Sequence, residues 1–221
     1  MDLSALALSL KLAAVTAAIL APLGVLLGRV LAWRAFRGKL LLEAVLALPL
    51  VLPPTVLGYY LLVAMGASSP IDTVHRWLIG RPLVFTFGGL VVASVIVNLP
   101  FAIQPMQRAF EAISRDVRDA AACSGLTRLA IFSRIELPLA WPGIASALVL
   151  TFAHTLGEFG VVLMVGGNIQ GETRTMAVAI YDRVQAFDDR GAAVMSATLL
   201  ALSLVAILLV YATTGRRAVQ R

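Results

Sequence analysis

Residues 114–142 read SRDVRDAAACSGLTRLAIFSRIELPLAWP, the longest stretch that is both polar and clearly patterned in an otherwise apolar chain. Ser114 is a suitable helix N-cap, and Asp116 and Asp119 follow in the first turns, where carboxylates favour the helix dipole. Three consecutive alanines then give high helix propensity with little side-chain bulk. Gly125 is expected to end the helix, because glycine takes the left-handed conformation without a Cβ clash. A helix this thin can lie with its backbone deep in a groove of another protein.

A second short helix is expected to follow within the same stretch. Thr127 can cap it, and it should run over residues 128–135. Pro138 is expected to block its continuation, because proline lacks an amide hydrogen and clashes with the preceding turn. The sequence therefore predicts a compact helix-turn-helix in a loop between two membrane spans.

The composition places the chain among membrane proteins. Of its 221 residues, 60% are hydrophobic and 14% are charged, and the mean hydropathy is +0.91. The formal net charge is +6, but the basic residues stand at the ends of apolar runs instead of forming a patch, so no nucleic-acid partner is expected. The single cysteine, Cys123, excludes an internal disulfide framework. It is expected to be a buried, inert small residue, with a redox sensor as the alternative.

Five apolar runs are long enough to cross a bilayer. They cover residues 8–31, 41–65, 83–103, 142–165 and 192–212. The predicted fold class is an all-α polytopic membrane protein of about five transmembrane helices, forming a single domain over residues 1–221. The first run is expected to be an uncleaved span, because neither clustered positive charge nor a small-residue cleavage site accompanies it. The third run should continue as a helix into water as far as Ile113.

The segments around these runs have their own signals. Pro49, Pro53 and Pro54 should kink or break the second span. Residues 66–82 are rich in turn-forming residues and are expected to form a loop. Apolar residues at helical spacing over residues 177–187 predict a short amphipathic helix.

The distribution of Lys and Arg predicts the orientation. The loop after the first span, the patterned loop and the C-terminal tail together hold twelve of these residues, against six on the other faces. Cytoplasmic segments carry an excess of positive charge. We therefore expect a cell-membrane protein with its N-terminus outside, and with its C-terminus and the patterned loop in the cytoplasm.

Two ionisable residues fall within the fourth predicted span. His154 and Glu158 are four residues apart, so they should share one face of a helix. The chain has no HExxH motif and no nucleophile paired with a base, so we predict no metal, no cofactor and no catalytic residue. Glu158 should face the interior of the bundle, because an intramembrane carboxylate is costly in lipid. Two roles stay open. One is an isolated structural pair with His154 or with a polar group of another span, and the other is a pathway gate together with Gly157 and Gly160.

The patterned loop resembles a known signature. Asp119-Ala120-Ala121, Gly125 and Ile135-Glu136-Leu137-Pro138 match the spacing E-A-A-x(3)-G-x(9)-I-x-L-P, which is the EAA signature of ABC importer membrane subunits. Aspartate replaces the usual glutamate at 119, which keeps the charge and shortens the arm. The resemblance implies a type I ABC importer transmembrane-domain fold in which the loop at residues 114–138 docks onto an ATP-hydrolysing subunit. The implied docking residues are Asp119, Ala120, Ala121, Gly125, Ile135, Leu137 and Pro138.

Two further segments resemble molybdate permeases. They are LPPTVLGYYLL at residues 52–62 and LGEFGVVLMVGGNIQGETRTMAVAIY at residues 156–181. Elements of the second segment also occur in sulfate permeases, and the Pro-Pro-Thr and Gly-Tyr-Tyr elements favour molybdate or tungstate. The resemblance implies a homodimer of this chain in the lipid membrane, two ATPase subunits and an extracytoplasmic molybdate-binding protein.

The function expected from these resemblances is that of a permease subunit that imports molybdate or tungstate. The chain contains no GxxxxGK[ST] motif, so a partner should hydrolyse ATP. Three alternatives are a permease for another oxyanion such as sulfate, an ion-coupled secondary transporter and a structural scaffold. The second would usually show inverted repeats and ionisable residues at the membrane midplane, and neither is visible. The third would not need the spacing from Gly125 to Pro138.

Overall fold

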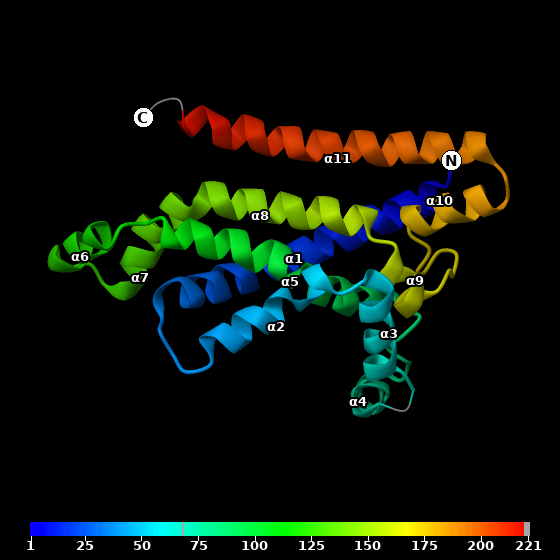
Figure 1. The fold of residues 1–221 in the computed structure, drawn as a ribbon, viewed down its shortest axis with the longest axis horizontal. Helices are drawn as coiled ribbons and strands as arrows, with labels where there is room; N and C mark the ends of the chain where they lie inside the picture. Colours follow the sequence, from blue (N-terminus) through cyan, green and yellow to red (C-terminus); the bar gives the residue numbers. More distant parts are fainter. Residues whose placement is uncertain (68, 219–221) are drawn as a thin grey trace.

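The computed structural model describes residues 1–67 and 69–218, and within these ranges every regular element is a helix (Figure 1). Ser68 of the expected loop and the tail residues 219–221, which include Arg221, lie outside them. Four helices are long and apolar enough to cross a membrane, and a bent pair raises the number to five if it counts as one span. The four are α1 (Leu3–Trp33), α5 (Phe87–Glu111), a helix over Arg128–Gly157 and α11 (Asp189–Ala218). The predicted class of about five transmembrane helices is confirmed.

The core forms where α1, α5 and α8 (Leu137–Gly157) pack together. Leu20 of α1, Met106 and Phe110 of α5 and Ile144 of α8 are almost completely buried there. Gly28 allows a close approach, because a Cβ at this position would lie 2.9 Å from the backbone of α5. Lipid is as apolar as these side chains, so close van der Waals packing is the main force that holds the three helices together within the membrane.

The second predicted span is broken, as its prolines predict. α2 (Lys39–Val51) and α3 (Pro54–Met65) differ in direction by 115°. Pro54 occupies the first turn of α3, where a missing amide hydrogen costs no intrahelical bond. Residues 41–65 therefore supply two short helices that leave the bundle axis in different directions.

The expectation that residues 66–82 form a loop is wrong, because they contain helix α4 (Pro70–Ile79). The Ser69 hydroxyl caps this helix by accepting a hydrogen bond from the Asp72 amide at 3.0 Å. Gly80 ends it in the left-handed conformation, with φ at +77°. The turn-forming residues mark the two ends of a helix.

The buried carboxylate of Asp72 explains why α4 stays folded against the chain. It accepts hydrogen bonds from the Arg76 guanidinium and, at 3.0 Å, from the Leu83 amide eleven residues on. These two donors, Arg76 first, hold the pKa of Asp72 below its ordinary value. The carboxylate therefore joins α4 to the connecting segment, residues 80–86, that leads into α5.

The fourth span begins earlier than expected. α7 (Arg128–Ile131), the π-helical turn η1 (Phe132–Glu136) and α8 form one continuous helix, so the expectation that Pro138 ends a short helix is wrong. The Leu137 amide bonds to the Phe132 carbonyl, five residues back. Pro138 follows directly in the first turn of α8. The shift to wider hydrogen bonding admits a residue that lacks an amide hydrogen and would clash in a regular turn.

The same span also ends earlier than expected. α8 stops at Gly157, Glu158 is extended with ψ at 123°, and α9 (Gly160–Gly166) starts anew. The predicted range of residues 142–165 therefore joins two different helices. The third predicted helix starts at Phe87 instead of residue 83 and continues past the apolar run to Glu111, as expected.

The remaining short helices gather at the two ends of the molecule. α6 (Arg115–Cys123) and α7 project at one end, toward which the last turns of α11 also run (Figure 1). The N-terminus and α10 (Met176–Gln185) lie at the opposite end. α10 confirms a helix in the predicted range, but its buried residues are Met176, Val178 and Ala179, whereas Tyr181 and Val184 of the predicted apolar face are exposed. The α6–α7 segment and the region formed by the N-terminus and α10 thus lie at opposite ends of one bundle, and each is a candidate for contact with another protein.

Candidate functional site

The projecting helix-turn-helix has the local geometry that its sequence predicts. The Ser114 hydroxyl accepts a hydrogen bond from the Val117 amide at 3.4 Å, and the Thr127 hydroxyl accepts one from the Ala130 amide at 3.3 Å. Gly125 takes φ of +79° between the two helices. The two caps and the left-handed glycine are confirmed, and together they determine the orientation of α6 relative to α7.

α6 is poorly covered by the rest of the chain. Ala121 is its single buried residue, while Asp119 and Ala120 are exposed. Apolar side chains also face water nearby: Val117 is 43% exposed and Leu129 of α7 is 74% exposed. An uncovered apolar surface on a thin helix is suited to contact with another protein.

Glu136, the last residue of η1, is the structural centre of this end. It is completely buried. Arg29 of α1 donates from Nε to Oε2 at 2.6 Å and from Nη2 to Oε1 at 3.3 Å, and Arg118 of α6 donates from Nε to Oε1 at 3.1 Å. The Arg118 guanidinium also stacks on Trp33, 3.7 Å from the ring centroid. One carboxylate therefore joins three separate segments.

Sequence reasoning assigned no role to Glu136, although one signal was visible. It is the single acidic residue between Asp119 and Glu158, and it stands at the start of an apolar run. Such a carboxylate needs a cationic partner if it is buried. The partner in α1 lies 107 residues away, so no local pattern could identify it.

A cavity of about 370 Å³ opens beside this carboxylate, between α1 and the helix-turn-helix. Its lining includes four arginines and two acidic residues, namely Arg29, Arg34, Arg118, Arg128, Asp119 and Glu136. Asp119 is the first residue of the predicted signature, and Glu136 belongs to the signature's second half. Both line this cavity.

The remaining signature residues lie along the continuous helix below the turn. Ile135 in η1 and Leu137 at the start of α8 are half-buried, and Pro138 is exposed. The link between the two halves of the signature is the Arg118–Glu136 ion pair.

The membrane carboxylate Glu158 lies at the break between α8 and α9, and it is 7% exposed. Its Oε1 accepts a hydrogen bond from the Val161 amide at 3.1 Å, so it caps α9. Its Oε2 lies 3.9 Å from Nε2 of His154, whose Nδ1 lies 3.1 Å from Oδ1 of Asn98 in α5. The predicted His154–Glu158 proximity is confirmed, and Asn98 is a third member that sequence reasoning missed.

The two glycines beside Glu158 differ in their surroundings. A Cβ on Gly160 would lie 2.8 Å from Cβ of Pro54, so α9 packs directly on the start of α3. A Cβ on Gly157 would meet nothing within 4 Å. The packing thus requires a glycine at 160 and does not require one at 157.

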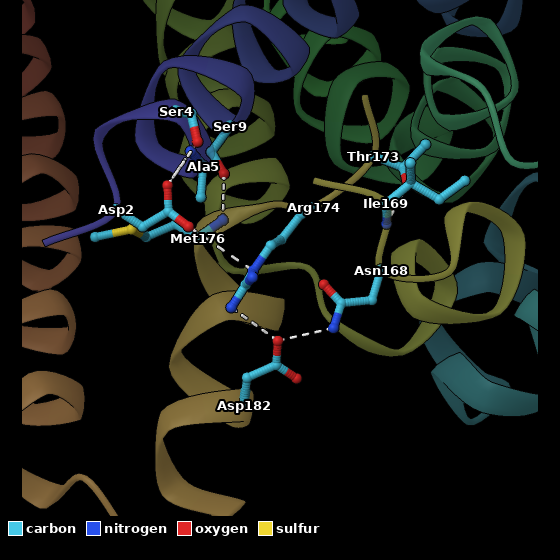
Figure 2. Close-up of polar contacts among 10 residues, drawn as sticks. All are labelled: Asp2, Ser4, Ala5, Ser9, Asn168, Ile169, Thr173, Arg174, Met176 and Asp182. Carbon is cyan, nitrogen blue, oxygen red and sulfur yellow. Dashed lines mark hydrogen bonds and ion pairs between the residues drawn. The ribbon is translucent and has the colours of Figure 1, made fainter. Parts of the chain in front are cut away.

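A second polar cluster joins the N-terminus to the segment after α9. Figure 2 shows Arg174 between Asp2 and Asp182, with Nη2 2.9 Å from Oδ2 of Asp182 and Nε 3.8 Å from Oδ2 of Asp2. Asn168 donates to the same oxygen of Asp182 at 2.7 Å. Hydrogen bonds from the Ser4 hydroxyl and then the Ala5 amide hold the pKa of Asp2 below its ordinary value. The cluster fastens this loop to the start of α1 and the middle of α10.

Comparison with known proteins gives a consistent set of similarities. A family model described as "Binding-protein-dependent transport system inner membrane component" matches residues 22–218. The molybdenum transport system permease protein ModB of Azotobacter vinelandii is 50% identical over 187 residues, which is 85% of this chain and 83% of that protein. The ModB protein of Escherichia coli (strain K12) is 37% identical, covering 93% of this chain and 90% of that protein.

More distant similarities extend the comparison. A probable sulfate transport system permease protein of Chlorella vulgaris is 30% identical, covering 95% of this chain and 78% of that protein. Among solved structures, a chain of a bacterial alginate ABC transporter, crystallised with a periplasmic protein that holds an alginate pentasaccharide, matches with a TM-score of 0.74. That match covers 97% of this chain and 78% of the other at 18% identity, which shows a shared transmembrane-domain fold.

Proposed function

This chain belongs to the family of binding-protein-dependent transport system inner membrane components, and on that premise we propose that it is the membrane subunit of a molybdate importer. The observation that carries the proposal is the 50% identity to a molybdenum permease across 83% of that protein. The sulfate permease similarity is 30%, so sulfate is the second candidate. Tungstate resembles molybdate in charge and shape, so the same pathway should accept it.

Uptake by the reconstituted importer tests the substrate. The chain is incorporated into lipid vesicles with its ATPase subunit and its binding protein, and uptake of radioactive molybdate is measured with ATP. Excess unlabelled tungstate should compete with molybdate, and excess sulfate should compete weakly. Uptake of sulfate without uptake of molybdate would contradict the proposal.

The proposed assembly contains two copies of this chain, two ATPase subunits and one extracytoplasmic binding protein. The family description, which names a binding-protein-dependent system, supports the last of these partners. The absence of a P-loop motif from the sequence supports hydrolysis of ATP in a separate subunit. Two copies of an integral membrane subunit with about five spans each would enclose the pathway between them.

The helix-turn-helix of α6 and α7 is the proposed docking element for the ATPase subunit. Three features support this role. Val117 and Leu129 are exposed apolar residues, the alanines of α6 have little side-chain bulk, and the element projects from the bundle (Figure 1). The proposed contact residues are those of the signature, Asp119, Ala120, Ala121, Gly125, Ile135, Leu137 and Pro138. Asp119 and Ala120 are the better candidates for direct contact, since they are exposed, whereas Ala121 is buried and Ile135 and Leu137 are half-buried.

The proposed orientation puts this docking element in the cytoplasm, where ATP is available. The excess of Lys and Arg on its side of the membrane supports that orientation. The N-terminus and the cluster around Arg174 would then lie on the outer side, where a binding protein could reach them.

Glu158 is the proposed gate residue, with Gly157 and Gly160 at its sides. Its position at a helix break, its buried carboxylate and its contact with His154 support a place on the transport pathway. Closure of the ATPase pair would draw the two docking elements together, and rigid-body rocking of each bundle would open the pathway outward.

A further inference from the structure

We propose that the Arg29–Glu136–Arg118 group is the mechanical link that carries movement of the docking helix into the membrane. The inference rests on the proposed docking of α6 to an ATPase. Glu136 belongs to the continuous helix that becomes α8, Arg29 belongs to α1, and Arg118 belongs to α6. A pull on α6 is thereby transmitted to two membrane helices at one point.

The first support is that α6 has few other attachments. Ala121 is the single residue of the helix that is buried, so little apolar packing could transmit a force. Arg118 supplies the specific polar contact from α6 to the bundle, through its ion pair with Glu136, and its guanidinium also stacks on Trp33. Arg118 is therefore a tether between an otherwise exposed helix and the core.

The second support is the geometry of the carboxylate. Three charge-assisted hydrogen bonds of 2.6, 3.1 and 3.3 Å converge on a side chain with no exposure to solvent. Charged pairs of this kind are directional, so they hold the relative position of the groups that they join. A buried ion pair often adds little net stability, because desolvation opposes the Coulombic gain, and its clearer effect is to select one arrangement.

The third support is the separation of this point from the contact surface. Glu136 is buried, so it cannot touch an ATPase subunit, and the exposed residues of α6 can do so without it. Docking and transmission are therefore separable. Glu136 is a positioning residue: its loss should leave the ATPase attached while the ATPase movement no longer reaches the membrane helices efficiently.

The test measures the number of molybdate ions transported per ATP hydrolysed by the complete complex in vesicles. This ratio does not depend on how much complex folds. Glu136→Gln keeps the shape of the side chain and removes its charge. We expect the ratio to fall by about tenfold or more, because the ionic attraction to both arginines is lost and one of the two acceptor oxygens becomes an amide nitrogen that cannot accept. The ATPase should copurify with the variant as it does with the unchanged chain.

Four further variants separate transmission from simple damage. Arg118→Gln should lower the ratio as Glu136→Gln does, and because its side chain is 29% exposed it should not disrupt the buried core. The two changes together should be no worse than either alone, as expected for members of one link. Arg118→Lys keeps the charge and should restore much of the ratio. Glu111→Gln is the matched control, since Glu111 pairs with Arg108, a side chain that is 82% exposed, and the ratio should not change.

The outcomes distinguish the link from the docking itself. An unchanged ratio in both Glu136→Gln and Arg118→Gln, with the ATPase still bound, would overturn the link and leave the docking proposal intact. Additive losses in the double variant would also overturn it. Failure of the unchanged chain to bind any ATPase would instead overturn the proposed function, and the link with it.

Discussion

The Met176 amide at the start of α10 donates a buried hydrogen bond of 2.8 Å to the Ser9 hydroxyl of α1, 167 residues away. Figure 2 shows this bond next to the Arg174 cluster. The two contacts fix the polar segment after α9 on the first helix of the chain. The end of the bundle opposite to α6 is therefore also held by a few specific polar contacts.

Replacing Ser9 with alanine should destabilise the protein. The Met176 amide would lose its partner in a buried environment, which costs about 1–3 kcal/mol. Thermal unfolding in detergent measures the change, and Ser4→Ala is the control, because that hydroxyl lies at an exposed position. An equal stability of the Ser9→Ala and Ser4→Ala variants would show that the amide finds another partner.

The single cysteine allows a test of orientation without any substitution. The expectation that Cys123 is buried is wrong, because it is exposed at the end of α6. A thiol reagent that cannot cross membranes should therefore label it in inside-out vesicles and not in intact cells. Bound ATPase should protect it. As a control, Gln170→Cys in a Cys123→Ser chain introduces a thiol at the opposite end and should label in intact cells. Labelling of Cys123 from outside would reverse the orientation and remove the docking proposal.

The sequence predicts the helix caps, turns and breaks that depend on interactions within a few residues. Ser114, Thr127 and Gly125 act through hydrogen bonds and backbone angles within a few residues, and their predicted conformations are observed. The break at Pro53 and Pro54 is local in the same sense. Each of these signals depends on one turn of chain, so each can be read without the rest of the fold.

The features that escaped prediction depend on distant partners or on unusual hydrogen bonding. The helix continues through Pro138 because a π-helical turn precedes it, and no sequence pattern used here predicts such a turn. α4 has local caps at Ser69 and Gly80, but its position depends on the bond from the Leu83 amide to the Asp72 carboxylate, eleven residues apart. Glu136 acquires its role from Arg29, 107 residues earlier.

Two substitutions at Glu158 should separate its charge from its capping bond. Glu158→Gln retains an acceptor for the Val161 amide, so the chain should assemble normally, and molybdate uptake should fall if the carboxylate acts as a gate. Glu158→Ala removes both the charge and the cap. Uptake and the amount of assembled complex are measured for each. Normal uptake with glutamine together with impaired assembly with alanine would identify a purely structural cap.

The last prediction concerns Gly125, which aims the docking helix. Its φ of +79° is a conformation in which a side chain with a Cβ costs about 1–2 kcal/mol, and a β-branched one more. A Cβ there would meet nothing within 4 Å, so Gly125→Val acts through the backbone alone and should re-aim α6 without disturbing the membrane helices. Membrane insertion should therefore persist, while copurification of the ATPase and binding-protein-stimulated ATP hydrolysis should both decrease.

The matched control for this change is Gly80→Val. Gly80 also ends a helix, has φ of +77° and has open space where a Cβ would lie, so the backbone strain is the same. It lies at the end of α4, away from the proposed docking element, and ATPase binding should survive. Since the two substitutions differ in location and not in local strain, a difference in ATPase binding reports the role of α6. Equal binding and equal transport in the two variants would show that the aim of α6 is not what couples ATP hydrolysis to transport.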